Sequence, residues 1–173
     1  MALHMLRIIL AIVHGLLFIR TLTESGDKRD GQCPPPEIMN TDEIANLYKD
    51  FNYSDHSISL SDFIKAAQEP NTVILDLRDS NDYKKGHIKG ALHIGADITI
   101  EKLNQLVPRS DTTILVYCTN SFKLTRKMSL TYIVIPQIYR LGYKQVYYLD
   151  AVVDFQNGSE IIKKIQWEGA PID

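Results

Sequence analysis

Cys118 is the residue of this 173-residue chain whose surroundings most suggest chemistry. It follows the apolar run ILVY and opens the polar segment TNSFKLTR, which ends at Arg126. The thiolate form of cysteine is a nucleophile, and nearby cations or helix N–H groups favour that form over the thiol. We therefore predict an exposed, nucleophilic sulfur at Cys118, with Lys123 and Arg126 binding an anionic substrate. Three small polar residues add hydrogen-bonding groups: Thr119, Asn120 and Ser121.

An unreactive core cysteine is the simpler interpretation, because free cysteine is among the most buried residue types. The position of Cys118 favours a site instead. It stands at the exit of the apolar run, whereas a core cysteine would more naturally fall within it. In parallel sheets, binding sites lie beyond the carboxyl ends of the strands.

Five segments have the length and composition of strands, and helical segments alternate with them. The expected strands are 57–60, 73–77, 90–94, 112–118 and 145–150. Apolar spacing predicts helices over 62–69, 99–107 and 124–141. The alternation predicts an α/β fold with a central parallel β-sheet of about five strands and helices on both faces.

Three residues are expected to shape these helices. Ser61 is a suitable N-cap for the helix 62–69. Pro136 should kink the helix 124–141 or split it in two, and Gly142 should end it.

The first residues differ from the rest of the chain. Arg7 precedes an apolar run at 8–19 and polar residues follow, which is the pattern of a secretory signal. The run is shorter than the roughly 20 apolar residues of a membrane-spanning helix. An uncleaved leader that tethers the protein through 8–19 and an amphipathic or buried helix stay open as alternatives. We expect a leader at 1–25, a linker and N-terminal extension at 26–56 and one domain at 57–171, in an exported protein that is periplasmic, secreted or membrane-anchored.

Composition excludes several classes of partner. A net charge of −2 and a pI near 6.2 argue against a surface that binds nucleic acid. Two cysteines, Cys33 and Cys118, are too few for a disulfide scaffold, although a bridge between them stays open. No cluster of cysteine and histidine has the spacing of a zinc site, so no metal is expected.

The pattern resembles the rhodanese-like domain over roughly residues 57–171. The most specific piece is VILDLRDSNDYKKGHIKGALHI, residues 73–94. The other pieces are Cys118 after ILVY, the segment RLGYKQVYYLD and a closing segment with Trp167, Gly169 and Pro171. In the first piece, the residues that match the family pattern are Asp76, Arg78, Asp82, Tyr83, Gly86, His87, Ile88, Gly90 and Ala91.

The resemblance implies a sulfurtransferase that carries a sulfane sulfur as a Cys118 persulfide. The donor would be thiosulfate or a persulfide, and the acceptor cyanide or a thiol, including a protein thiol. No organic cofactor or metal would be needed. Asp76, Arg78 and His87 would support the site, mainly as scaffold, and the spacing of Asp82 places it within reach of an ion pair with Arg78.

The loop after Cys118 departs from the family pattern. Seven residues separate Cys118 from Arg126 and none is glycine, whereas the family's usual loop is shorter and contains one. Two alternatives therefore stay open beside the enzyme. One is a catalytically inactive rhodanese-fold binding or regulatory module. The other is a cysteine-dependent phosphatase or arsenate reductase, although the Cys–Arg loop of those enzymes is also shorter.

Overall fold

The computed structural model describes residues 40–107, 109–123, 125, 127–151 and 162–172. The chain divides into two units, Met1–Glu37 and Ile38–Asp173, and the first lies outside the described residues. The predicted leader, Cys33 and residues 26–39 of the predicted linker therefore cannot be compared with the structure, whereas residues 40–56 are described. Within the described residues, no helix is long and apolar enough to span a membrane.

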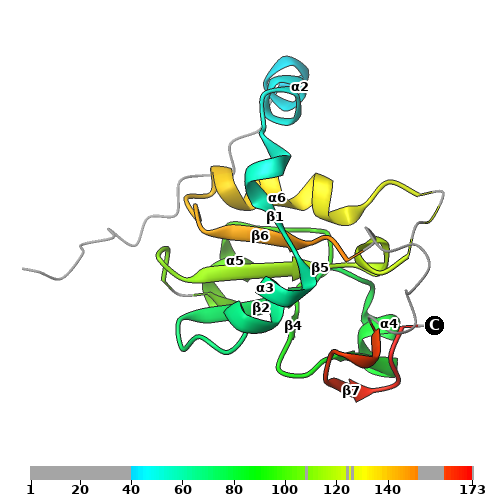
Figure 1. Cartoon of the computed structure of the whole chain (residues 1–173). Helices are drawn as coiled ribbons and strands as arrows, with labels where there is room; N and C mark the ends of the chain where they lie inside the picture. Colours follow the sequence, from blue (N-terminus) through cyan, green and yellow to red (C-terminus); the bar gives the residue numbers. More distant parts are fainter. Residues whose placement is uncertain (1–39, 108, 124, 126, 152–161, 173) are drawn as a thin grey trace, which may run out of the picture. The chain divides into compact units, whose positions relative to one another are not determined.

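A five-stranded parallel sheet forms the centre of the described unit (Figure 1). Its strand order is β1-β6-β5-β2-β4, and every neighbouring pair is parallel. The strands are β1 (Ser57–Ile58), β2 (Thr72–Asp76), β4 (Leu92–His93), β5 (Thr113–Tyr117) and β6 (Val146–Leu149). The predicted strands were thus placed correctly; β2 begins one residue earlier than predicted with the same length, and the other four are shorter than the sequence suggested.

Helices cover both faces of this sheet. They are α2 (Thr41–Lys49), α3 (Leu60–Ala66), α4 (Ser80–Lys85), α5 (Ile100–Leu106) and α6 (Leu130–Arg140), with single 3-10 turns η1 (Tyr53–His56) and η2 (Thr119–Ser121). Side chains of a strand alternate between faces. Ile114 and Val116 accordingly pack in the cluster that contains residues of α5 and α6, whereas Leu115 and Tyr117 pack with Phe63 of α3.

A second, two-stranded sheet closes the fold. β3 (Gly86–Ile88) pairs antiparallel with β7 (Trp167–Gly169), so the chain's last described segment lies beside α4 and β3 (Figure 1). The two backbones approach closely at Gly86. A Cβ atom there would lie 1.8 Å from the Ala170 carbonyl oxygen, so only glycine fits.

Two helix predictions need correction. Ser59, rather than Ser61, caps α3 by accepting a hydrogen bond from the Asp62 N–H, because the helix begins two residues earlier than predicted. Pro136 does not split the helix in two, since it lies inside α6, which continues to Arg140. The predicted stop is confirmed: Leu141 is the C-cap, and Gly142 follows with a φ of 99°.

The N-terminal segment explains how α6 tolerates Pro136. Proline has no N–H to donate to the carbonyl four residues earlier, which belongs to Tyr132. The Tyr53 hydroxyl donates a hydrogen bond to that carbonyl at 2.9 Å. The Tyr48 hydroxyl of α2 donates to the next carbonyl, that of Ile133, at 3.2 Å. Residues before β1 therefore satisfy backbone groups of α6.

Candidate active site

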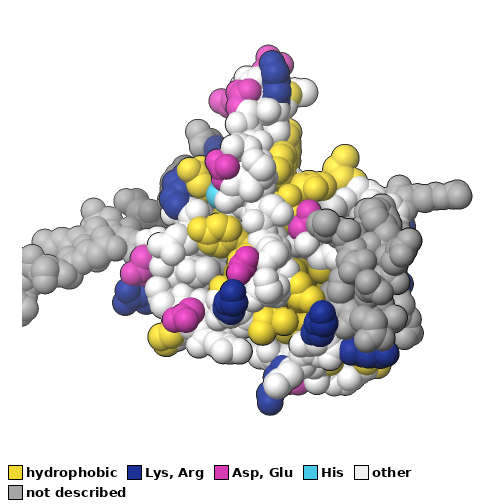
Figure 2. All heavy atoms as spheres, viewed as in Figure 1, with side chains coloured by type: hydrophobic (Ala, Val, Ile, Leu, Met, Phe, Trp, Pro, Cys, Tyr) yellow, Lys and Arg dark blue, Asp and Glu magenta, His cyan; other side chains and the backbone are white. Residues whose placement is uncertain are grey.

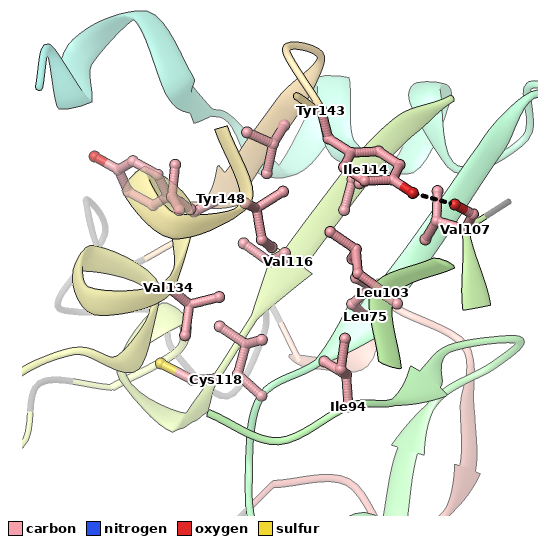
Figure 3. Packing of buried hydrophobic residues seen from close by; sticks show 14 residues of the cluster. Leu75, Ile94, Leu103, Val107, Ile114, Val116, Cys118, Val134, Tyr143 and Tyr148 are labelled. Atoms are coloured by element: carbon pink, nitrogen blue, oxygen red, sulfur yellow. Dashed lines mark hydrogen bonds between the residues drawn. The ribbon is translucent and has the colours of Figure 1, made fainter. Parts of the chain in front are cut away.

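Cys118 directly follows β5, at the carboxyl edge of the sheet. It continues the alternation of Ile114 and Val116, so its side chain lies on the face covered by α6. Figure 3 shows its sulfur at the margin of this cluster, on the side away from Leu103 and Tyr143. The expectation of an exposed sulfur is wrong, because the residue is 2% exposed. It is a free cysteine.

Polar groups nevertheless surround the sulfur. Cys118 and Ser121 face each other across η2: the Ser121 N–H lies beside the sulfur and donates to the Cys118 carbonyl oxygen at 3.1 Å, and the Cys118 N–H donates to Ser121 Oγ at 3.2 Å. The sequence suggested a long helix beginning soon after Cys118. Instead, in the described residues of this segment, the single turn η2 follows and α6 begins at Leu130.

Ser129 brings the start of α6 to the sulfur. Its hydroxyl oxygen lies 3.4 Å from Cys118 Sγ and 2.7 Å from Thr131 Oγ1. Ser129 occupies the N-cap position of α6 but makes no capping hydrogen bond with its side chain. The N-terminal end of an α-helix carries unpaired N–H groups and a partial positive charge, which stabilise an anion. A serine before an apolar helix is a recognisable N-cap signal, so Ser129 could have been found from the sequence.

A cavity of about 640 Å³ opens at this edge of the sheet. Of the predicted site residues, Cys118, Thr119, Asn120 and Arg78 line it. Ser121 instead lines a neighbouring cavity of about 310 Å³. The other described lining residues of the larger cavity are Leu77, Asp79, Asp82, His93, Gly95, Ala96, Thr125, Lys127, Met128 and Leu130.

The structure describes one of the two predicted anion-binding cations. Lys123 is exposed and is not among the described lining residues. Arg126 lies outside the described residues, so its predicted role is not compared with the structure. Lys127, which the sequence analysis did not select, lines both cavities.

Arg78 is held by a buried ion pair at the base of the cavity. Its Nη2 lies 2.6 Å from Asp76 Oδ2 and 2.7 Å from the Gly86 carbonyl oxygen. The predicted pair between Arg78 and Asp82 is wrong, since Asp82 instead pairs with Lys85 at 3.3 Å. Arg78 precedes α4, and its guanidinium group points toward Asp76 at the end of β2.

Tyr117 completes this buried network, and no local pattern of residues indicated that role. Its hydroxyl donates to Asp76 Oδ2 and accepts from the Ile88 N–H at 3.1 Å. Burial, reinforced by Asp76, raises the pKa of Tyr117 well above its usual value. Burial lowers the pKa of Arg78, but its hydrogen bonds and charge interaction with Asp76 outweigh that effect and hold the pKa above its usual value. The network links β2, β3 and β5 beneath the cavity.

The two histidines of the motif have different places. His87, predicted as a supporting residue, stacks on Tyr83 with ring centroids 3.9 Å apart. Its Nδ1 lies 3.0 Å from the Tyr83 carbonyl oxygen and its Nε2 lies 3.5 Å from Glu168. It is not among the cavity's described lining residues, whereas His93 is. In the described part of the chain, no group of three or more His, Cys, Asp or Glu side chains could hold a metal ion.

Comparison with known protein families gives a match across the site. The model of the rhodanese-like domain matches residues 59–151. Among curated proteins, tRNA uridine(34) hydroxylase of Enterobacter sp. (strain 638) is 32% identical over 83 residues, which cover 42% of this chain and 23% of that protein. The protein of the same name from Salmonella paratyphi B is 32% identical over 75 residues, covering 38% and 21%. The chain thus spans less than a quarter of the length of these relatives.

Solved structures share the fold. The BH2092 protein of Bacillus halodurans superposes with a TM-score of 0.50 at 21% identity, covering 75% of this chain and 87% of that chain. An EanB variant in complex with hercynine superposes with a TM-score of 0.51 at 18% identity, covering 69% of this chain and 29% of that chain.

Proposed function

Because this chain belongs to the rhodanese-like domain family, we propose that it is a sulfurtransferase that carries a sulfane sulfur as a persulfide on Cys118. The observation that carries this proposal is the position of the sulfur. Cys118 lines a cavity at the carboxyl edge of the sheet, and its sulfur contacts both the Ser121 N–H and the Ser129 hydroxyl at the start of α6.

The reaction has two halves, as in other covalent catalysis. The Cys118 thiolate attacks the outer sulfur of the donor, a new S–S bond forms, and the donor's own S–S bond breaks with its electron pair on the leaving group. The leaving group is sulfite when thiosulfate is the donor and a thiolate when a persulfide is. An acceptor thiol or cyanide then attacks the outer sulfur and releases the Cys118 thiolate. The Ser129 hydroxyl can donate a hydrogen bond to the negatively charged sulfur, and the Ser121 N–H lies beside it.

The charges around the described cavity favour a persulfide donor over thiosulfate. Arg78 is already paired with Asp76, and the lining includes the carboxylates of Asp79 and Asp82 beside Lys127. A dianion such as thiosulfate gains little electrostatic stabilisation from a lining in which positive and negative charges balance. A persulfide carries only one negative charge and therefore needs less of that stabilisation. A thiol acceptor, including a protein thiol, suits the same cavity. Export through residues 1–25 is proposed from the sequence pattern alone.

Nucleic acid is not proposed as a partner. tRNA appears in the name of the curated relatives, but the match spans less than a quarter of their length. The net charge of −2 does not favour binding to phosphates. On the face drawn in Figure 2, basic and acidic side chains are interspersed.

A non-catalytic binding module is the second candidate. Two observations favour it: Cys118 is only 2% exposed, and the loop after it lacks glycine. A tight ring of backbone N–H groups around an anion normally benefits from glycine. In such a module the buried sulfur would serve packing alone.

Intact-protein mass spectrometry separates the two candidates. The wild-type chain and Cys118→Ser are incubated with a small-molecule persulfide or thiosulfate, without reducing agent. We expect the wild type to gain the mass of one sulfur atom and to lose it again when a thiol is added. Cys118→Ser should gain no mass. An unchanged mass with both donors would reject the sulfurtransferase and leave the binding module.

A further inference from the structure

His93 places an imidazole in the cavity that contains Cys118. It is the last residue of the edge strand β4 and stands opposite Asp76 in the register with β2. Its side chain lines the cavity together with Cys118, Thr119 and Asn120. The neighbouring backbone is fixed, since the Ile94 and Gly95 N–H groups both donate to the Asp76 carbonyl at 3.1 Å.

One contact determines which ring nitrogen of His93 carries a proton. Nε2 lies 2.9 Å from the Arg78 carbonyl oxygen. A carbonyl oxygen only accepts hydrogen bonds, so Nε2 must carry the proton when the ring is neutral. The lone pair of the neutral ring therefore resides on Nδ1. Because Arg78 is itself held in the buried ion pair with Asp76, its carbonyl oxygen is a fixed acceptor that orients the His93 ring.

Nδ1 is accessible and has no described partner. The contacts of His93 within the described residues are the bond from Nε2 and a tilted ring contact with Tyr83 at 5.0 Å. Every buried side-chain nitrogen or oxygen among the described residues has a hydrogen-bond partner. Because Nδ1 has no such partner, it is not a buried atom. His93 lines the cavity, so Nδ1 is accessible to a molecule that binds there.

The two carboxylates of the described lining, Asp79 and Asp82, already have hydrogen-bond or ion-pair partners. The Asp79 carboxylate caps α4 by accepting from the Asn81 and Asp82 N–H groups. The Asp82 carboxylate lies 3.3 Å from Lys85 Nζ. Imidazole also exchanges protons near neutral pH, where an ionised carboxylate is a weak base. His93 is thus the described lining residue best suited to accept a proton.

We propose that His93 Nδ1 is the general base of the second half-reaction, a role that rests on the proposed sulfur transfer. An acceptor thiol enters the cavity, its S–H bond breaks, and the proton moves to Nδ1. The acceptor sulfur forms a bond with the outer sulfur of the Cys118 persulfide. The bond between the two sulfurs of that persulfide breaks, and its electron pair stays on Cys118 Sγ. The products are an acceptor persulfide, the Cys118 thiolate and a protonated His93, and no oxidant or reductant is consumed.

A pair of acceptors with different acidity tests the proposal. The persulfide is formed first, excess donor is removed, and its single-turnover decay is followed with dithiothreitol, a weakly acidic thiol, and with thionitrobenzoate, which is already ionised. General-base catalysis contributes about 10²–10⁴-fold in rate, so we expect His93→Gln to slow the reaction with dithiothreitol at least about tenfold. The reaction with thionitrobenzoate should be unchanged, because no proton has to be removed.

His56→Gln is the matched control, since His56 also contacts a backbone carbonyl, that of Val146, but lies outside the cavity's described lining. This variant should behave as wild type with both thiols. Should His93→Gln fail to fold, His93→Ala with added imidazole replaces it, and imidazole should restore the rate with dithiothreitol. Equal rates of His93→Gln and wild type with dithiothreitol, or no rescue in His93→Ala, would overturn the role of His93 and leave sulfur transfer intact. Failure of the wild type to form a persulfide would reject both proposals.

Discussion

Ser129 Oγ lies 3.4 Å from Cys118 Sγ, although ten glycine-free residues lie between the two positions. The loop therefore does more than connect β5 with α6: it returns the chain to the sulfur so that the first turn of α6 begins there. Ser129 is supported from behind by the hydroxyl of Thr131, which is 2% exposed. The Ser129 hydroxyl and the first residues of α6 lie beside the sulfur, where a glycine-rich loop would instead present a ring of backbone N–H groups.

Replacing Ser129 by Ala should make the sulfur less reactive. The hydroxyl can donate a hydrogen bond to the thiolate, and such a bond contributes about 1 kcal/mol, or about fivefold in the thiolate population. We expect alkylation of Cys118 by iodoacetamide at neutral pH to slow about fivefold. Ser54→Ala, an exposed serine that bonds to Asn52, serves as control and should alkylate like wild type. Equal rates for Ser129→Ala and wild type would remove Ser129 from the site.

Replacing Arg78 by Ala should strongly destabilise the fold. The change leaves the Asp76 carboxylate, which is 0% exposed, without its cation. Breaking a buried ion pair in this way costs about 3–5 kcal/mol in the free energy of unfolding. Urea denaturation measures the effect. Arg109→Ala breaks the exposed pair with Asp111 and should leave the unfolding midpoint almost unchanged. Similar midpoints for the two variants would contradict the structural role of Arg78.

The Tyr53 hydroxyl and Pro136 should be energetically coupled. Tyr53→Phe removes the donor to the Tyr132 carbonyl, and we expect a loss of about 1 kcal/mol in the free energy of unfolding. Pro136→Ala supplies a backbone N–H that can bond to the same carbonyl. In the Pro136→Ala background, Tyr53→Phe should therefore cost clearly less. A double-mutant cycle by denaturation measures this difference, and purely additive effects would show that Tyr53 does not compensate for the proline.

Gly86 should tolerate no larger residue. A Cβ atom would overlap the Ala170 carbonyl, so Gly86→Ala must separate β3 from the segment after β7. We expect a loss of about 3 kcal/mol, at the upper end of the usual cost of overpacking. Gly90→Ala is the comparison, because Gly90 has a φ of 79° but open space around it. That variant should lose about 1–2 kcal/mol from backbone strain alone. Thermal unfolding that ranks the two variants in the opposite order would refute the close approach.

Local patterns explain which parts of the fold were predictable. Apolar runs such as 73–77 and 112–118 report burial on both faces of a parallel strand, and their alternation with helical spacing identifies the α/β class. Boundaries were harder. Ser59 and Ser61 are both good caps, and the residue types alone do not show that the helix begins at Leu60. Pro136 was expected to bend or divide a helix. The sequence alone could not show that the Tyr132 carbonyl, which loses its N–H donor at the proline, accepts a hydrogen bond from Tyr53, far away in the chain.

The ion pair of Arg78 shows the same limit within the site. Spacing suggested Asp82 as its partner, but a four-residue spacing brings side chains together only inside one helix. Arg78 lies before α4, and the buried carboxylate of Asp76 attracts its guanidinium more strongly than a half-buried one on α4 can. The contacts of Tyr117 with Asp76 and of His93 with the Arg78 carbonyl join different strands, so no local pattern reveals them.

The sequence by itself determined the class of fold, the family and the place of Cys118 at a strand end, because periodicity and motif spacing are properties of neighbouring residues. Only the tertiary structure decided that the sulfur is buried, that Ser129 approaches it and that His93 shares its cavity. These relationships depend on how separate elements pack across the edge of the sheet, and packing is set by the whole core at once.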